Sequence, residues 1–268
     1  MPQYTNLSQG TPFWVDLSSP DIEASMSFYA NLFGWSYEEA PPEDVGGRRY
    51  AWAQISPGYP AGIASLDNEA IASGAEPQWS VQLLVDDMDE IVNRIADFRG
   101  SIVQAPAKVG EYGIGAQIAD PTGGRVNIWQ AFQSGPTIKH EHGSMQWCEL
   151  MTPDPETAAA FYRMLLRVKT DPMEMPDGSV NSIVSTKDGP VMGISALGGL
   201  SEELLACFGG PTWIVYFNVD DVDAAVERAV QNGAELPDPP WDVPGVGRIA
   251  WIFDPLGALL GLITPPSS

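Results

Sequence analysis

Two acidic residues stand beside tryptophans at matching places in the chain and could carry acid–base chemistry. Asp16 lies two positions after Trp14, and Glu149 lies two positions after Trp147. Because side chains alternate between the faces of a β-strand, each carboxylate shares a face with its tryptophan. A carboxylate among aromatic rings can have a raised pKa and act as a general acid or base, or it can neutralise a ligand amine. Tyr216 is a further candidate proton donor, with a place in a cavity wall as the alternative.

The other reactive side chains form no catalytic pattern. The two histidines, His140 and His142, both lie in the segment at 133–143 that joins the halves of the chain, so no Ser-His-Asp arrangement is expected. The sequence His-Glu-His could capture a metal ion there, but we interpret it as part of a solvated linker. The two cysteines, Cys148 and Cys207, lack metal or redox spacing and lie in apolar contexts, which predicts buried thiols.

The composition is that of an acidic globular protein. Hydrophobic residues make up 44 % of the chain, and 13 Lys and Arg stand against 35 Asp and Glu, a net charge of −22. Such a surface repels phosphate, so we expect neither nucleic acid nor a membrane as a partner, and it favours cationic small molecules only weakly. The sequence contains no apolar run of about 18 residues and no secretory signal, so a cytoplasmic location is expected.

A repeat organises all 268 residues of the chain. The segment SFYANLFGW at 27–35 returns as AFYRMLLRVK at 160–169, and the same offset of 133 residues separates Trp14 from Trp147. An Asp-Asp pair before a helix and a later Asp-Pro turn recur with an offset of 134 residues. Two motifs at a nearly fixed offset indicate a tandem duplication. We predict an N-terminal module at 1–133, a linker at 134–143 and a C-terminal module at 144–268.

Each module is expected to follow the order β-α-β-β-(β)-α-β-β, with helices that begin after capping aspartates such as Asp21 and Asp154. In the first module we predict helices at 22–33 and 88–98, and strands at 13–17, 50–55, 62–66, 78–85, 101–104, 115–119 and 125–131. In the second we predict helices at 155–166 and 222–232, and strands at 147–151, 181–186, 191–196, 213–219, 246–253 and 258–264.

This pattern resembles the vicinal oxygen chelate superfamily, which includes glyoxalase I, bleomycin-resistance proteins, fosfomycin-resistance enzymes and extradiol dioxygenases. The features that carry the resemblance are a strand, a capped helix with FY..LFGW, a strand ending in Val-Asp-Asp before a helix, and a final DP.G turn. The resemblance implies an α+β fold in which two tandem βαβββ-type modules pair into curved mixed sheets around a cavity. The chain is similar to two-module actinomycete proteins associated with antibiotic biosynthesis or resistance, some of which accompany anthracycline tailoring enzymes.

The resemblance also identifies the positions at which relatives bind metal. Superfamily enzymes place His, Gln or Glu at the start of the first strand and Glu on the last strand of a module. Here Trp14 and Trp147 occupy the first-strand positions, and Asn127 and Gly261 occupy the last-strand positions. Tryptophan and glycine offer no ligand and asparagine is a weak one, whereas zinc or iron needs several imidazole, thiolate or carboxylate donors. We therefore predict that the protein holds no metal and no other cofactor.

Aromatic side chains stand where metal ligands are expected. About half of the nine tryptophans, Trp35 most clearly, are expected to pack helices on the outer faces of the sheets, and the others to line an apolar cavity for a flat ligand. The expected ligand-binding residues are Trp14, Asp16, Trp52, Gln82, Asn127, Trp129, Trp147, Glu149, Tyr216 and Trp251. In the superfamily an acid at the place of Asp16 or Glu149, two residues after the first-strand position, often only bonds to backbone or to an arginine, so a structural role is the alternative to catalysis for both residues.

Three functions follow as hypotheses. The leading one is a metal-free binding protein for an aromatic or polycyclic antibiotic or polyketide, which sequesters the compound or assists a tailoring oxygenase. The alternative is a metal-independent glyoxalase-like or hydroxylase-associated enzyme of secondary metabolism that uses Asp16, Glu149 or Tyr216. The third is a metal-dependent enzyme whose ligands have moved. Because two fused modules supply what single-module relatives obtain by dimerising, a monomer is expected, with a dimer as the alternative.

Overall fold

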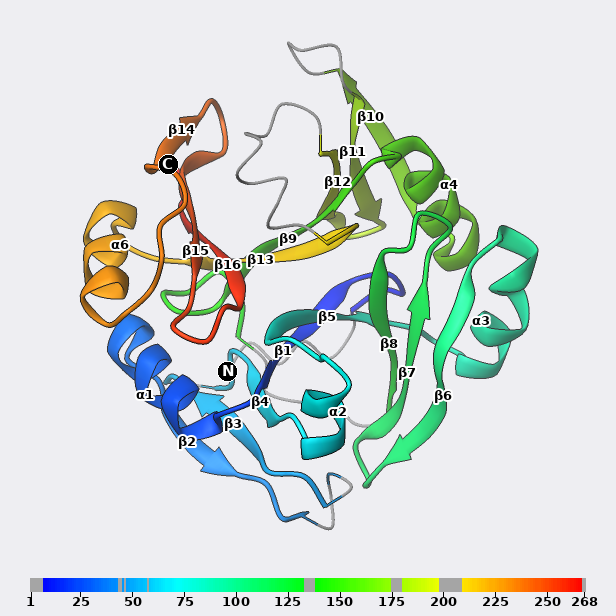
Figure 1. Ribbon diagram of the computed structural model, residues 1–268. Helices are drawn as coiled ribbons and strands as arrows, with labels where there is room; N and C mark the ends of the chain where they lie inside the picture. Colours follow the sequence, from blue (N-terminus) through cyan, green and yellow to red (C-terminus); the bar gives the residue numbers. More distant parts are fainter. Residues whose placement is uncertain are drawn as a thin grey trace.

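The computed structural model describes residues 7–266 except 43–44, 46, 57, 133–137, 175–179 and 198–208 (Figure 1). The N-terminal strands are β1 (Pro12–Ser19), β2 (Ser36–Glu39), β3 (Tyr50–Gln54), β4 (Gly62–Ser65), β5 (Gln78–Leu84), β6 (Ser101–Val109), β7 (Gly113–Ala119) and β8 (Arg125–Ala131). The N-terminal helices are α1 (Ile22–Phe33), α2 (Asn68–Ala72) and α3 (Met88–Arg94). The C-terminal strands are β9 (Met145–Thr152), β10 (Lys169–Glu174), β11 (Val180–Thr186), β12 (Gly189–Ala196), β13 (Thr212–Asn218), β14 (Trp241–Val243), β15 (Gly247–Phe253) and β16 (Leu259–Thr264), with helices α4 (Pro155–Leu166) and α6 (Val222–Gln231).

Each half of the chain forms one eight-stranded mixed sheet. The N-terminal order is β2-β3-β4-β1-β5-β8-β7-β6, and the C-terminal order β10-β11-β12-β9-β13-β16-β15-β14 follows the same pattern. Each sheet consists of two βαβββ units that meet where β1 pairs with β5, or β9 with β13, in antiparallel fashion. The predicted α+β fold and tandem duplication are therefore confirmed. Within the described residues, no helix is long and apolar enough to cross a membrane.

The sequence does not reveal the edge strands or the short helix α2. It predicts no strand at β2, β10 or β14, and it predicts a loop after residue 104, where β6 in fact continues to Val109. None of the residues in these four strands is buried, so they lack the apolar alternation by which a strand is recognised. Pro106 is compatible with β6 because an edge strand can leave its outward N–H position unpaired.

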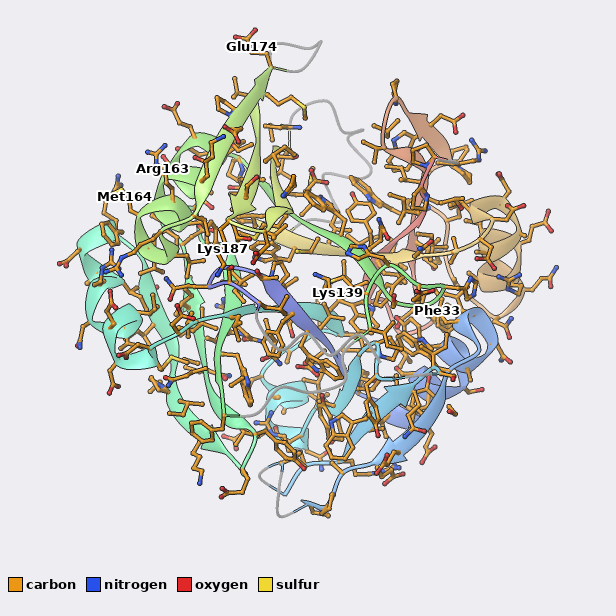
Figure 2. The ribbon with its side chains drawn as sticks, turned by 180° about the vertical axis from the view of Figure 1, so that it is seen from behind. Phe33, Lys139, Arg163, Met164, Glu174 and Lys187 are labelled. Atoms are coloured by element: carbon orange, nitrogen blue, oxygen red, sulfur yellow. The ribbon has the colours of Figure 1, made fainter. Side chains whose placement is uncertain are left out.

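One hydrophobic core covers the helix-bearing faces of both sheets. Phe217 of β13 contacts Trp79 of β5, with ring centroids 4.9 Å apart, and Phe33 of α1 at 5.1 Å. Figure 2 labels Phe33 where α1 approaches the C-terminal half. Helix α1 also packs beside α6, and α3 beside α4 (Figure 1). Because the modules meet through these faces, the opposite faces of the two sheets, which we call the inner faces, point away from one another.

Two equivalent hydrogen bonds cross between the modules inside this core. The hydroxyl of Tyr29 on α1 donates to Oδ2 of Asp254 at 2.9 Å, and the hydroxyl of Tyr162 on α4 donates to Oδ2 of Asp120 at 3.1 Å. Both carboxylates are at most 4 % exposed. The Oδ1 atom of each aspartate holds its own Asp-Pro turn by accepting backbone N–H groups. The FY motif of each module therefore bonds to the Asp-Pro motif of the other.

We expect Tyr29→Phe and Tyr162→Phe each to lower the free energy of unfolding by about 1–3 kcal/mol, because each leaves a buried carboxylate oxygen without its donor. Denaturant-induced unfolding measures the loss. The control is Tyr37→Phe. The Tyr37 hydroxyl is buried and has no hydrogen-bond partner in the described part of the chain, so its removal should leave the free energy of unfolding unchanged. Equal losses in all three variants would contradict the assignment.

Candidate functional site

The inner face of the N-terminal sheet gathers the residues predicted to bind a ligand in that module. The register places Gln82 opposite Trp14 and beside Asn127, and it places Trp52 of β3 opposite Gly62 of β4. Six predicted residues share this face and are partly exposed: Trp14, Asp16, Trp52, Gln82, Asn127 and Trp129. The neighbouring positions on each strand point into the core, so strand alternation alone accounts for the grouping.

Three neutral donors surround the carboxylate of Asp16. Its Oδ1 atom accepts from the indole Nε1 of Trp14 at 2.9 Å and from the hydroxyl of Tyr50 at 2.7 Å, while Oδ2 accepts from Nε2 of Gln82. Burial raises the pKa of Asp16, and the three hydrogen bonds oppose that shift. Sequence reasoning missed Tyr50, although its spacing of two from Trp52 places both on one face of β3.

Glycines make room for this arrangement. A Cβ atom on Gly62 would lie 1.9 Å from the hydroxyl oxygen of Tyr50 and 2.3 Å from Oδ1 of Asp16. A Cβ atom on Gly113 of β7 would lie 2.6 Å from the indole of Trp129. Real Cβ atoms do not approach so closely, so the carboxylate and the rings lie directly against the backbone of neighbouring strands.

An aromatic pair joins the two sides of the curved N-terminal sheet. Tyr112, in the turn before β7, packs edge-on against Trp52 of β3, with ring centroids 6.0 Å apart. Strands β3 and β7 are each second from opposite edges of the sheet, so these side chains can meet only because the sheet curls. Sequence reasoning missed Tyr112 because no periodicity or motif connects a turn residue with a strand on the far side of the sheet.

A row of amide and hydroxyl groups extends from Asp16 across the sheet. The hydroxyl of Ser80 donates to the backbone oxygen of Asp16 at 3.2 Å, and Nδ2 of Asn127 donates to the Ser80 oxygen at 3.3 Å. Nε2 of Gln117 in turn donates to Oδ1 of Asn127 at 3.2 Å. This face therefore combines a polar centre with aromatic sides, the composition typical of small-molecule sites.

The C-terminal inner face holds the equivalent carboxylate in a different setting. The hydroxyl of Ser195 donates to Oε1 of Glu149, and the hydroxyl of Tyr216 donates to Oε2 at 3.1 Å. Nε1 of Trp251 donates to the Tyr216 oxygen at 2.9 Å, and Trp147 lies opposite Tyr216 in the register. Burial raises the pKa of Glu149, and burial together with the Glu149 carboxylate raises the pKa of Tyr216. Tyr216 therefore stays protonated at neutral pH.

Beyond the two hydroxyl groups that bond to Glu149, the C-terminal inner face holds an apolar cluster whose central aromatic residues are buried, while Trp147 and Trp241 are partly exposed. Tyr216 is 4 % exposed and Trp251 is 5 % exposed, and Trp241 of β14 packs edge-on against Trp251 at 5.4 Å. The buried cluster consists of Met151, Ile214, Tyr216, Ile249, Trp251 and Ile263. The structure thus divides the ten predicted residues into two sets, because Trp147, Glu149, Tyr216 and Trp251 lie on the other sheet.

The positions that the family resemblance assigns to metal ligands carry poor metal ligands. The aligned neighbours across three strands are Trp147, Tyr216 and Gly261 in one sheet and Trp14, Gln82 and Asn127 in the other. An indole offers no lone pair, and a protonated phenol and neutral amides are poor ligands. Within the described ranges, no three His, Cys, Asp or Glu side chains come together. The donor set does not fit zinc, iron or manganese.

The remaining reactive residues have other contacts. Nδ1 of His140 lies 3.1 Å from Oε1 of Gln146, and Nδ1 of His142 lies 3.3 Å from a carboxylate oxygen of Asp220. Cys148 is buried in the core, as expected, and burial raises the pKa of its thiol to about 12. The predicted buried thiol of Cys207 lies outside the described residues. Three tryptophans pack in the core on the helix-bearing faces: Trp35, Trp79 and Trp213.

We expect Gly62→Ala to lower the free energy of unfolding by about 1–3 kcal/mol, since the new methyl group displaces Tyr50 and Asp16. The control is Gly209→Ala, because a Cβ atom on Gly209 would meet nothing within 4 Å and its φ is not left-handed. Thermal or denaturant unfolding compares the two variants. Equal stabilities of Gly62→Ala and Gly209→Ala would show that the space beside Gly62 tolerates a methyl group.

The raised pKa of Asp16 makes the stability of the folded protein depend on pH, and the direction of the shift fixes the sign of that dependence. A folded-state pKa above the ordinary 3.8 means that the native state binds the proton more tightly, so stability is lost as the pH rises from 3.8 through the raised pKa. Asp16→Asn keeps an acceptor oxygen and cannot ionise. We expect the stability of this variant, relative to the unchanged protein, to increase from about pH 3.5 to pH 7 in urea unfolding series. A relative stability that is constant or falls across this range would refute the sign.

The sequence of this chain matches known proteins over nearly its whole length. The profile of the Glyoxalase/Bleomycin resistance protein/Dioxygenase superfamily matches residues 12–128 and again residues 144–262. CFP32 of Mycobacterium tuberculosis, whose name assigns it provisionally to the glyoxylases, is 35 % identical over 267 residues, which cover 99 % of this chain and 98 % of CFP32. The anthracycline biosynthesis protein DauV of Streptomyces sp. strain C5 is 31 % identical over 266 residues, which cover 95 % and 93 %.

Solved structures show the same fold at low sequence identity. The Mn(II)-bound glyoxalase from Novosphingobium aromaticivorans has a TM-score of 0.65 at 16 % identity, with 96 % of this chain and 83 % of that chain covered. The 2,3-dioxygenase LapB from Pseudomonas sp. KL28 has a TM-score of 0.66 at 15 % identity, with 97 % and 94 % covered. With both modules matched by one profile, the chain belongs to the Glyoxalase/Bleomycin resistance protein/Dioxygenase superfamily.

Proposed function

We propose that this protein binds a planar aromatic small molecule on the inner face of its N-terminal sheet, without a metal ion. The observation behind the proposal is that Trp14, Trp52 and Trp129 are partly exposed around a hydrogen-bonded polar centre. Stacking of a flat ring on indole contributes roughly 0.5–1.5 kcal/mol per well-placed pair beyond the burial of apolar area. The carboxylate and amides at the centre then fix the orientation of the ligand.

We place the site on the N-terminal face because of exposure. The central aromatic residues of the C-terminal face, Tyr216 and Trp251, are 4 % and 5 % exposed and already pack against their own neighbours. A ligand there would have to displace that apolar cluster, whereas Trp52 and Trp129 are accessible as they stand. The C-terminal sheet then acts as a scaffold that shares the core.

The relatives support a polycyclic ligand. DauV is named for anthracycline biosynthesis, and anthracyclines contain fused planar rings. A protein that binds such a compound can sequester it, or can carry it to or from a tailoring oxygenase. In this proposal the partners are therefore the aromatic compound and that enzyme, and the protein acts as a monomer in the cytoplasm.

We expect titration with an anthracycline and with its aglycone to change the tryptophan fluorescence of metal-free protein, whose metal content is checked by elemental analysis. Trp52→Ala should weaken binding about tenfold or more, because it removes a stacking surface worth roughly 1.4 kcal/mol or more. Trp241→Ala is the control, since Trp241 is also partly exposed and packs edge-on against an aromatic neighbour, but lies on the C-terminal sheet. Flat titrations, or binding that requires added metal, would reject the proposal.

A further inference from the structure

The carboxylate of Asp16 has no cationic partner in the described part of the chain. Its donors are the indole of Trp14, the phenol of Tyr50 and the amide of Gln82, all of them neutral. The ion pairs found among the described residues join other side chains. A charge that is partly removed from water without a countercharge is costly, so a cation brought by a ligand would be favoured at this position.

The carboxylate also keeps capacity for one more donor. A carboxylate accepts about four hydrogen bonds, and here Oδ1 accepts two and Oδ2 accepts one. Asp16 is partly exposed on the same face as Trp14 and Trp52, so the free position at Oδ2 belongs to the proposed binding face. Gly62, directly opposite in the neighbouring strand, adds no side chain that would cover the carboxylate.

We propose that the ligand of the N-terminal inner face is a flat aromatic cation whose protonated amine donates to Oδ2 of Asp16. This inference rests on the proposed function and names the ligand class of the same site. The ammonium supplies the missing countercharge while its ring system lies against the tryptophans. Indole and phenol faces also attract cations directly, and the net charge of −22 raises the local concentration of cationic molecules.

Glu149 provides an internal comparison. It is the equivalent carboxylate of the other sheet, and it likewise takes only neutral donors, from Ser195 and Tyr216. Tyr216, which bonds to Glu149, is 4 % exposed and Trp251 is 5 % exposed, so neighbouring side chains cover the aromatic rings at the centre of that face. Trp147 and Trp241 beside them are partly exposed. Substitution of either carboxylate by its amide changes the net charge by the same amount. A comparison of the two variants therefore distinguishes a contact of the ligand with Asp16 from an effect of the overall charge.

Three anthracene derivatives with one shared ring system test the ligand class. At neutral pH 9-(aminomethyl)anthracene is a cation, 9-(hydroxymethyl)anthracene is neutral, and anthracene-9-carboxylate is an anion. Isothermal titration calorimetry on the full-length protein gives their dissociation constants. We expect the amine to bind at least about tenfold more tightly than the alcohol, and the carboxylate to bind most weakly.

Asp16→Asn tests the residue. Its amide oxygen can still accept from Trp14 and Tyr50, but the negative charge is gone. We expect the affinity for the amine to fall about tenfold or more and the affinity for the alcohol to fall by a smaller factor, so that the preference for the amine over the alcohol is lost. Glu149→Gln should leave both affinities unchanged. Thermal unfolding of both variants verifies that they fold.

These measurements test the binding of an aromatic ligand separately from the recognition of its cation by Asp16. Equal affinities of the unchanged protein for amine and alcohol would overturn the cation inference and leave aromatic binding in place. If Asp16→Asn and Glu149→Gln lose affinity for the amine equally, the preference for the amine comes from the overall charge, and the role of Asp16 is overturned. No binding of any of the three compounds would contradict both the proposed function and the inference. If Asp16→Asn does not fold, the comparison of the three probes on the unchanged protein decides alone.

Discussion

The arrangement of the molecule depends on two buried hydrogen bonds, from Tyr29 to Asp254 and from Tyr162 to Asp120. Each aspartate holds its own turn with one oxygen and the opposite module with the other, so local and long-range structure are fixed by one side chain. A buried carboxylate that lost its donors would be strongly destabilising, which makes the relative position of the modules specific. Hydrophobic contact alone is less directional.

The contact between the modules is formed by the helix-bearing faces of the sheets, and both inner faces lie outside the shared core. The two copies can therefore differ on their inner faces without disturbing the contact between modules. The N-terminal face has a polar row and partly exposed tryptophans, whereas the C-terminal face has a buried apolar cluster. Duplication of one scaffold has thus produced two surfaces of different chemistry in a single chain.

The first strand of the N-terminal module carries Trp14 where the family resemblance assigns a metal ligand. The indole of Trp14 can only donate, so it turns toward the carboxylate of Asp16 two residues along the strand. Tyr50 and Gln82 donate to the same group, and Gly62 lets the carboxylate lie against the backbone. The result is a carboxylate held by neutral hydrogen-bond donors on a partly exposed face.

The sequence by itself determined the duplication, the helix starts and the central strands, because motif spacing and apolar alternation are local properties. It also determined that Trp14 and Asp16 share a face. It did not reveal the edge strands, which have no buried side to impose a pattern. Only the tertiary structure brought Tyr112 to Trp52 and gave the two inner faces different exposure. Those features depend on sheet curvature and on packing between segments distant in sequence, which no local pattern encodes.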